Sequence, residues 1–178
     1  MKISTNKKYS IIYADPAWSY NDKNTRLSAD KQYKTSQLEE LKQLNINKIT
    51  AEDAILFMWA TFPMMQEALE VIKAWGFKYK TLGFSWIKLN KNGTPFFGIG
   101  HYTRSNCEVC LIGIKGKASK LIKDKSISSV IMEERRRHSE KPAIIRDKIV
   151  QLCGDLPRIE LFARHKIDGW DYFGNEVL

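Results

Sequence analysis

The sequence predicts a doubly wound α/β fold, in which helices cover both faces of a mostly parallel β-sheet. Two observations favour this fold: short apolar runs rich in β-branched residues, and segments with helical periodicity between them. Continuous apolar runs are typical of strands buried on both faces, and their alternation with helices is typical of parallel sheets. With 178 residues, of which 43% are hydrophobic and 28% charged, the chain fits a single domain over 1–178.

Apolar runs of five to seven residues predict five strands of the sheet. They are 9–14, 54–59, 81–87, 109–114 and 158–162. The first run ends abruptly at Asp15-Pro16, as expected for a buried strand followed by a rigid turn.

Periodic apolar positions predict three helices. They span about 36–44, 65–75 and 139–153. A Ser-x-x-Glu capping box at Ser36 opens the first helix. We expect Ser139 to cap the third helix, whose apolar face would contain Ile145, Ile149 and Leu152.

Two segments between these elements have the composition of long loops. The first, about 88–106, is rich in glycine and polar residues, and the second, about 116–137, contains closely spaced lysines and three consecutive arginines. The formal net charge of +9 suits a polyanionic partner, because each neutralised phosphate releases counterions. We expect both loops to contact nucleic acid, although an ordinary solvated surface has the same composition.

Ligands of doubly wound sheets lie at the carboxyl ends of the strands, which predicts a crevice between residues 15–18 and 163–165. There, the Asp15 carboxylate and the Pro16 carbonyl would be two acceptors held side by side, a match for an exocyclic amine. Accepting both amine hydrogens favours a pyramidal nitrogen whose lone pair faces an electrophile. Trp18 offers a flat face for an unstacked base. The alternative is a capped turn with a buried tryptophan.

Motifs along nearly the whole chain resemble the adenine N6-methyltransferases related to the eukaryotic enzymes that methylate messenger RNA. More broadly, they are similar to amino-methyltransferases of bacterial and phage DNA. The matching motifs are Asp15 to Trp18, Trp86 to Lys88, Gly98 to Arg104 with Glu108, His138 to Pro142, Glu160 to Arg164, and Gly174-Asn175. The resemblance implies a Rossmann-like class I methyltransferase fold with circularly permuted motifs, because the amine-binding motif precedes the cofactor motifs.

The resemblance also implies roles at the substrate end. Asp15 and Pro16 would hold the target amine, and Ala17 stands where the family has a second proline, which makes the turn less rigid. Trp18 and Tyr33 would border the base pocket. Phosphates would be bound by the basic loops, which include Arg104, Lys115 and Lys117.

At the cofactor end, the resemblance implies S-adenosyl-L-methionine as methyl donor. Asp15 would contact its amino group, and Lys141, at a helix N-terminus, would meet its carboxylate. The adenosine end would be lined by Phe162, Arg164, Asn175 and Glu176. Relatives often carry glutamine in place of the last of these.

The implied function is methylation of N6 of adenine in nucleic acid, with DNA favoured over RNA because the compact chain has a bacterial or phage character. The alternatives are methylation of the exocyclic amine of cytosine, a non-catalytic paralogue that binds nucleic acid, and methylation of a protein or small-molecule amine. Without a separate target-recognition domain, specificity would come from the two loops or from a second subunit, in a homodimer or with a different partner.

We expect neither a metal site nor a membrane-spanning segment. The Cys107-x-x-Cys110 pair lacks the two further ligands that a zinc site needs, which favours a structural role and no metal. The longest apolar run, about 54–65, is too short for a bilayer span, and no signal-peptide core follows the N-terminus. A cytoplasmic protein, of a bacterium or of a phage-infected host, is therefore expected.

Overall fold

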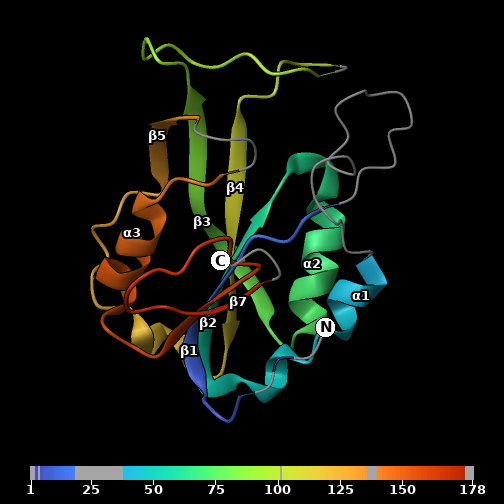
Figure 1. The fold of residues 1–178 in the computed structure, drawn as a ribbon, viewed down its shortest axis with the longest axis vertical. Helices are drawn as coiled ribbons and strands as arrows, with labels where there is room; N and C mark the ends of the chain where they lie inside the picture. Colours follow the sequence, from blue (N-terminus) through green and yellow to red (C-terminus); the bar gives the residue numbers. More distant parts are fainter. Residues whose placement is uncertain (1–2, 4, 19–37, 101, 136–139, 175–178) are drawn as a thin grey trace.

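A computed structural model of the chain describes residues 3, 5–18, 38–100, 102–135 and 140–174 (Figure 1). Their centre is a seven-stranded sheet with the order β5-β3-β4-β2-β1-β6-β7. The strands are β1 (Tyr9–Ala14), β2 (Thr50–Ala60), β3 (Lys78–Leu89), β4 (Cys107–Lys115), β5 (Val130–Glu134), β6 (Arg158–Leu161) and β7 (Asp171–Phe173). Neighbouring strands pair in parallel except at β4, which is antiparallel to both β2 and β3. The mostly parallel sheet expected from the sequence is confirmed.

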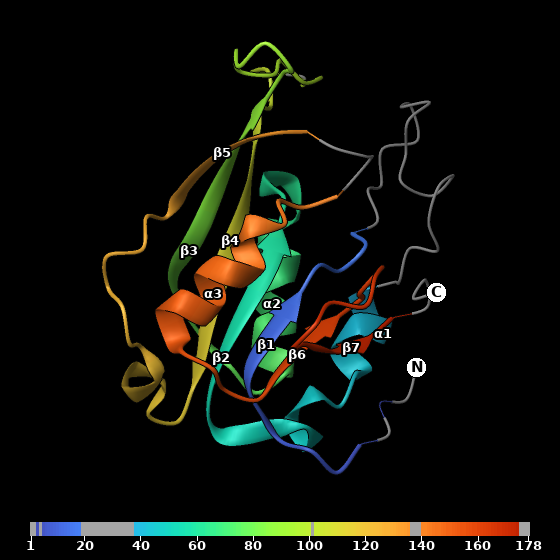
Figure 2. The same ribbon diagram turned by 60° about the vertical axis from the view of Figure 1, so that its left-hand side comes forward.

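Helices cover both faces of this sheet, so it is doubly wound (Figure 2). They are α1 (Leu38–Gln43), α2 (Met65–Ala74) and α3 (Ile144–Cys153), with short 3-10 turns at Ile46–Lys48, Phe62–Met64 and Ala118–Leu121. The buried side chains of α1 and α2 belong to one apolar core, and those of α3 belong to the other. In Figure 1 the two layers lie on either side of the strands. None of the described helices has the length and apolar character to cross a lipid bilayer.

The apolar runs are continuous because alternate residues of one strand enter opposite cores. Along β1, Ile12 packs in the core of α1 and α2, whereas Ile11 and Tyr13 pack in the core of α3. The strand β2 repeats this alternation, with Leu56 in the first core and Phe57 in the second. These central strands are buried on both faces, which is why their sequences carry no polar alternation.

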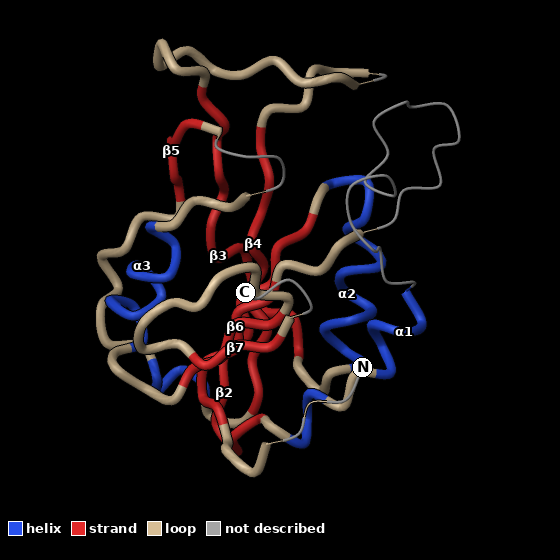
Figure 3. The backbone as a smooth tube through the Cα atoms, viewed as in Figure 1, coloured by secondary structure: helices blue, strands red, loops and turns tan. Residues whose placement is uncertain are grey.

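The expectation of a loop over 116–137 is wrong in part, because this segment contains the edge strand β5, which pairs with the end of β3. Only Ile131 of this strand is buried, whereas Val130 and Met132 are exposed, so its sequence lacks the pattern of a core strand. The loop expected over 88–106 is confirmed from residue 90 onward: apart from one isolated bridge between Leu89 and Pro95, its described residues form no helix or strand (Figure 3).

The predicted start of the third helix is also wrong. The helix α3 begins at Ile144, not beside Ser139, which lies outside the described residues. Its buried face contains Ile145, Ile149 and Cys153, whereas Leu152 is only partly buried. The described residues between Ser139 and the helix, 140–143, form no regular element.

Candidate active site

The two segments expected to form the site follow neighbouring strands. The strands β1 and β6 are parallel, and Ala14 lies opposite Leu161 at their carboxyl ends. Asp15 therefore leaves the sheet beside Phe162, at one edge. The expectation that residues 15–18 and 163–165 meet at this edge agrees with the strand register.

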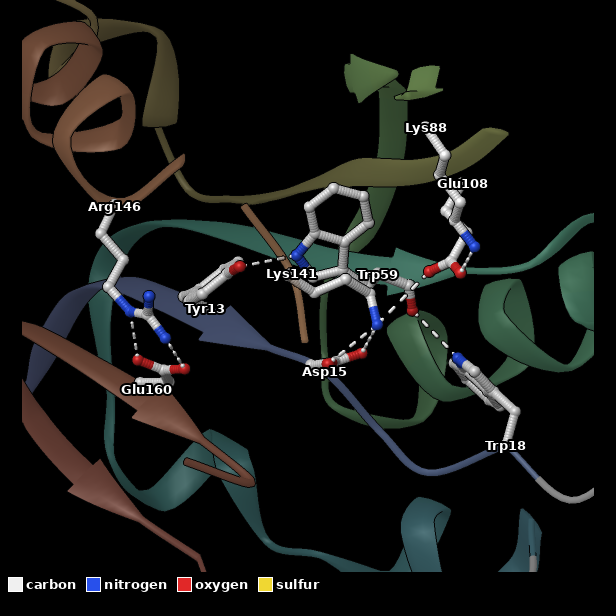
Figure 4. A network of polar contacts seen from close by, with 9 residues as sticks. All are labelled: Tyr13, Asp15, Trp18, Trp59, Lys88, Glu108, Lys141, Arg146 and Glu160. Carbon is white, nitrogen blue, oxygen red and sulfur yellow. Dashed lines mark hydrogen bonds and ion pairs between the residues drawn. The ribbon is translucent and has the colours of Figure 1, made fainter. Parts of the chain in front are cut away.

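The Asp15 side chain is held by an ion pair with Lys141 (Figure 4). The Lys141 ammonium lies 2.8 Å from Oδ1 and 2.9 Å from Oδ2 of Asp15, and 3.3 Å from Oε2 of Glu108. The other oxygen of Glu108 contacts the ammonium of Lys88. These four side chains, which we call the charge row, come from the ends of β1, β3 and β4 and from the segment before α3. All four are at most 21% exposed.

The charge row shifts the pKa of each group at its centre. Burial raises the pKa of Asp15, the nearby Glu108 adds to this, and Lys141 and Arg164 oppose it. Burial also acts to raise the pKa of Glu108, but its two lysine partners outweigh burial and lower it. For Lys141, burial acts to lower the pKa and the two carboxylates raise it. The charge row thus acts on its two carboxylates in opposite directions: the pKa of Asp15 is raised and that of Glu108 is lowered.

The turn after Asp15 is packed into the protein. Pro16 is buried, Ala17 is half-buried, and Trp18 is 7% exposed. The indole Nε1 of Trp18 donates to the backbone carbonyl of Trp59 over 3.0 Å. This placement matches the alternative of a buried tryptophan, whose bond fixes the turn against β2. A contact between Trp18 and a base stays a prediction.

The segment after β6 bends sharply. Phe162 has a φ of 62°, in the left-handed region that costs a non-glycine residue about 1–3 kcal/mol and is often found at functional sites. Its ring stacks on Trp75, with centroids 6.4 Å apart. A Cβ on Gly174 would lie 2.2 Å from the carbonyl oxygen of Ala163, so the chain after β7 passes directly against this bend. Arg164, which follows, is half-buried and lowers the pKa of Asp15.

A buried ion pair beside this bend was not anticipated from the sequence. Glu160 on β6 accepts two hydrogen bonds of 2.7 Å from the guanidinium of Arg146 on α3. The guanidinium also lies 5.7 Å from the ring centroid of Tyr13. The available signal was a glutamate inside the apolar run of β6, since a buried carboxylate needs a partner.

The other predicted residues fall in three places. Arg104 is exposed in the long loop that joins β3 to β4. Lys115 and Lys117 lie at the opposite edge of the sheet from Asp15, because β4 runs antiparallel and Lys115 pairs with Ala54 at the start of β2. There, the Lys115 ammonium donates to Asn47. A role for these two lysines in phosphate binding stays a prediction that this placement does not favour.

Tyr33, Asn175 and Glu176 lie outside the described residues. The three cysteines are free thiols, with Cys110 and Cys153 buried and Cys107 partly buried. Within the described ranges, no group of three or more His, Cys, Asp or Glu side chains is placed to hold a metal ion.

Comparison with known families decides what kind of site this is. The profile of the MT-A70 family matches residues 9–176. The chain belongs to the MT-A70 family. This assignment agrees with the class I methyltransferase fold, since the sheet is mostly parallel and helices cover both of its faces.

Several MT-A70 relatives are named as methyltransferases. The chain is 38% identical to the Type II methyltransferase M.MunI of a Mycoplasma species, over 96% of this chain and 78% of the relative. It is 28% identical to METTL3, the N(6)-adenosine-methyltransferase catalytic subunit of Homo sapiens, over 99% of this chain and 30% of that protein. A probable N(6)-adenosine-methyltransferase of Oryza sativa is also 28% identical, and the chain spans 23% of its length. The chain thus corresponds to most of the Mycoplasma relative and to under a third of the two eukaryotic ones.

Proposed function

We propose that this chain transfers a methyl group from S-adenosyl-L-methionine to N6 of adenine in nucleic acid, and that the nucleic acid is DNA. The observation that carries the proposal is the buried Asp15-Pro16 turn at the carboxyl end of the central strand β1, with Lys141 and Arg164 beside it. Family membership supports adenine N6 as the target. DNA is supported by the higher identity to the Type II methyltransferase M.MunI.

The turn would act by positioning the amine. The Asp15 carboxylate accepts one hydrogen of N6, and the Pro16 carbonyl accepts the second from a turn whose φ the proline ring fixes. Both bonds draw the nitrogen lone pair out of the ring and fix its direction. The ion pair with Lys141 holds the carboxylate in one orientation before the amine arrives. The hydrogen bond from Trp18 to Trp59 keeps the turn from shifting.

The side chains around Asp15 fit the proposed donor, which carries an ammonium, a carboxylate and an adenosine group. Asp15 offers an anion to the ammonium, and Lys141 and Arg164 offer cations to the carboxylate and hydroxyl groups. Phe162 offers an apolar ring beside them, and we place Asn175 and Glu176 at the adenosine end on the resemblance alone. S-adenosyl-L-methionine would supply an electrophilic methyl group at this point.

The test is methyl transfer from labelled S-adenosyl-L-methionine to unmethylated DNA and to RNA, followed by nucleoside analysis. We expect N6-methyladenine in DNA, no product from Asp15→Ala, and full activity from the matched control Asp168→Ala, whose side chain is exposed. Circular dichroism and urea denaturation would show that the inactive variant still folds.

Other outcomes distinguish the alternatives. Methylated cytosine as the product would show that the target is the exocyclic amine of cytosine and not that of adenine. Product in RNA alone would show that the substrate is RNA and not DNA. A folded protein that binds no cofactor would be a non-catalytic paralogue. A cofactor-bound protein that makes no product on either polymer would refute the adenine assignment for the isolated chain, and repetition with a candidate second subunit would test the need for a partner.

A further inference from the structure

The loop of residues 90–106, which we call the arm, exposes large apolar side chains at its tip. Phe97 and Ile99 are each 72% exposed, and Tyr102 is fully exposed. Phe97 and Ile99 flank Gly98 on one limb of the arm. Such side chains are costly to leave in water, and their gathering on one projection indicates a contact with a partner.

The arm is narrow and its two limbs are paired. The amide of Gly98 donates to the carbonyl of Ser105 over 3.0 Å, and a Cβ on Gly98 would lie 2.1 Å from that oxygen. A Cβ on Gly100 would lie 2.0 Å from the carbonyl oxygen of Thr103. Only glycine allows the limbs to approach this closely. The exposed apolar side chains therefore stand on a thin ribbon rather than on a broad surface.

The charges of the arm select the class of partner. No aspartate or glutamate occurs between Leu89 and Cys107, whereas Lys91 and Arg104 lie within the arm. At its base, the guanidinium of Arg135 lies 3.5 Å from the ring centroid of Phe96 and adds a further cation. Aromatic side chains interspersed with cations and free of anions suit a nucleic acid, whose bases stack and whose phosphates attract the cations.

The arm is anchored at the proposed active site. It leaves the sheet after Leu89 and returns at Cys107, next to Lys88 and Glu108, two members of the charge row that reaches Asp15 (Figure 4). The amide of Lys88 donates to the carbonyl of Asn106, which ties the two limbs together at this base. From there the arm extends past the ends of β3 and β4 (Figure 1). A duplex bound over Asp15 would therefore meet the arm.

We propose that Phe97, Ile99 and Tyr102 form a wedge that enters the duplex where the target adenine leaves the stack. The inference rests on the proposed function, because an adenine inside a duplex must be extruded before Asp15 can hold its amine. Extrusion leaves a gap between base pairs, and an apolar side chain inserted from a narrow projection fills it. Lys91 and Arg104 hold the flanking phosphates.

The first test measures binding and needs no methyl transfer. Fluorescence anisotropy would compare an intact DNA duplex with the same duplex lacking one base. We expect the wild-type chain to bind the duplex that lacks one base about tenfold more tightly, because no base has to be unstacked at the empty position. Tyr102→Ala and Phe97→Ala should lose this preference. The matched control is Tyr79→Ala, a half-exposed tyrosine at the start of β3 and so at the opposite edge of the sheet.

The second test measures methylation at a site mapped on DNA that the wild-type chain has modified. The target adenine is placed opposite thymine or opposite an abasic position. Tyr102→Ala should lower the rate on the paired duplex about tenfold or more and change the rate on the abasic duplex by less than about threefold. Tyr79→Ala should change neither.

The two proposals fail separately. Absence of N6-methyladenine from the wild-type reaction would refute the proposed function. Equal binding of the intact duplex and of the duplex that lacks one base would refute the wedge. Equal loss of activity on both duplexes would also refute it, since the arm would then contribute phosphate contacts alone. A change of oligomeric state of Tyr102→Ala in sedimentation would make the arm a protein interface instead.

Discussion

Replacing Glu108 by glutamine would measure how the charge row sets the pKa of Asp15. The two carboxylates contact one ammonium at 3.3 and 2.8 Å, so their nearest oxygens lie within about 6 Å. At an effective dielectric constant of about 20, two unit charges at this separation repel each other by about 3 kcal/mol. Because Asp15 and Glu108 are 20% and 15% exposed, solvent and salt reduce this repulsion, and we expect its removal to lower the pKa of Asp15.

The assay is the pH dependence of kcat/KM for methyl transfer. Under the proposed function, Asp15 accepts an amine hydrogen only when it is ionised, so activity should be lost as the pH falls through its pKa. Glu108→Gln removes the negative charge beside Asp15 and keeps the ion pair between Lys141 and Asp15. The pKa of Asp15 should fall, so the acid limb should move to lower pH. The control Glu52→Gln, at an exposed position, should leave the limb in place.

An acid limb that stays in place, or that moves to higher pH, would refute this reasoning. The pH dependence of the free energy of unfolding gives an independent test of the charge on Glu108. The pKa of Glu108 is lowered by folding, so its contribution to stability is present above its unfolded pKa and is lost as the pH falls through its folded pKa. The difference in free energy of unfolding between wild type and Glu108→Gln should therefore shrink as the solution is made acidic.

Two substitutions test the buried contacts around the site by urea denaturation. Glu160→Gln leaves the Arg146 guanidinium without its carboxylate and should lower the free energy of unfolding by about 3 kcal/mol, whereas Glu39→Gln, which breaks the more exposed ion pair with Lys42, should leave the midpoint unchanged. Trp59→Phe removes the donor that lies 2.6 Å from the buried hydroxyl of Tyr13 and should cost about 1–3 kcal/mol. Unchanged midpoints for Glu160→Gln or Trp59→Phe would show that the remaining groups find other partners.

Sequence patterns predicted the central strands β1 and β2, which are buried on both faces. Their runs 9–14 and 54–59 carry apolar side chains into two cores, so their composition alone identifies them. The edge strands β5 and β7 were missed because Ile131 is the only buried residue in either of them. Their backbones pair with neighbours that are distant in the sequence, and no local pattern records that pairing.

The position of Asp15 could be predicted because a strand end and a proline fix it locally. The partners of Lys141 could not, because Asp15 and Glu108 approach it from two strands far away in the sequence. A cluster of charged residues in the sequence likewise does not predict where those residues lie in the fold. Lys115 stands in a lysine-rich segment, yet the antiparallel course of β4 carries it to the edge away from Asp15.

Because β4 is antiparallel to β3, the arm can change in length and sequence without disturbing the sheet. The strand β3 runs toward the edge that carries Asp15 and β4 runs back from it, so the arm is a loop between two neighbouring, hydrogen-bonded strands. Doubling the length of such a loop costs only about 0.6 kcal/mol of closure entropy, and it leaves the register of the sheet intact. Target preference could therefore diverge among descendants of one scaffold through insertions at this single connection, while the Asp15 turn remained the same.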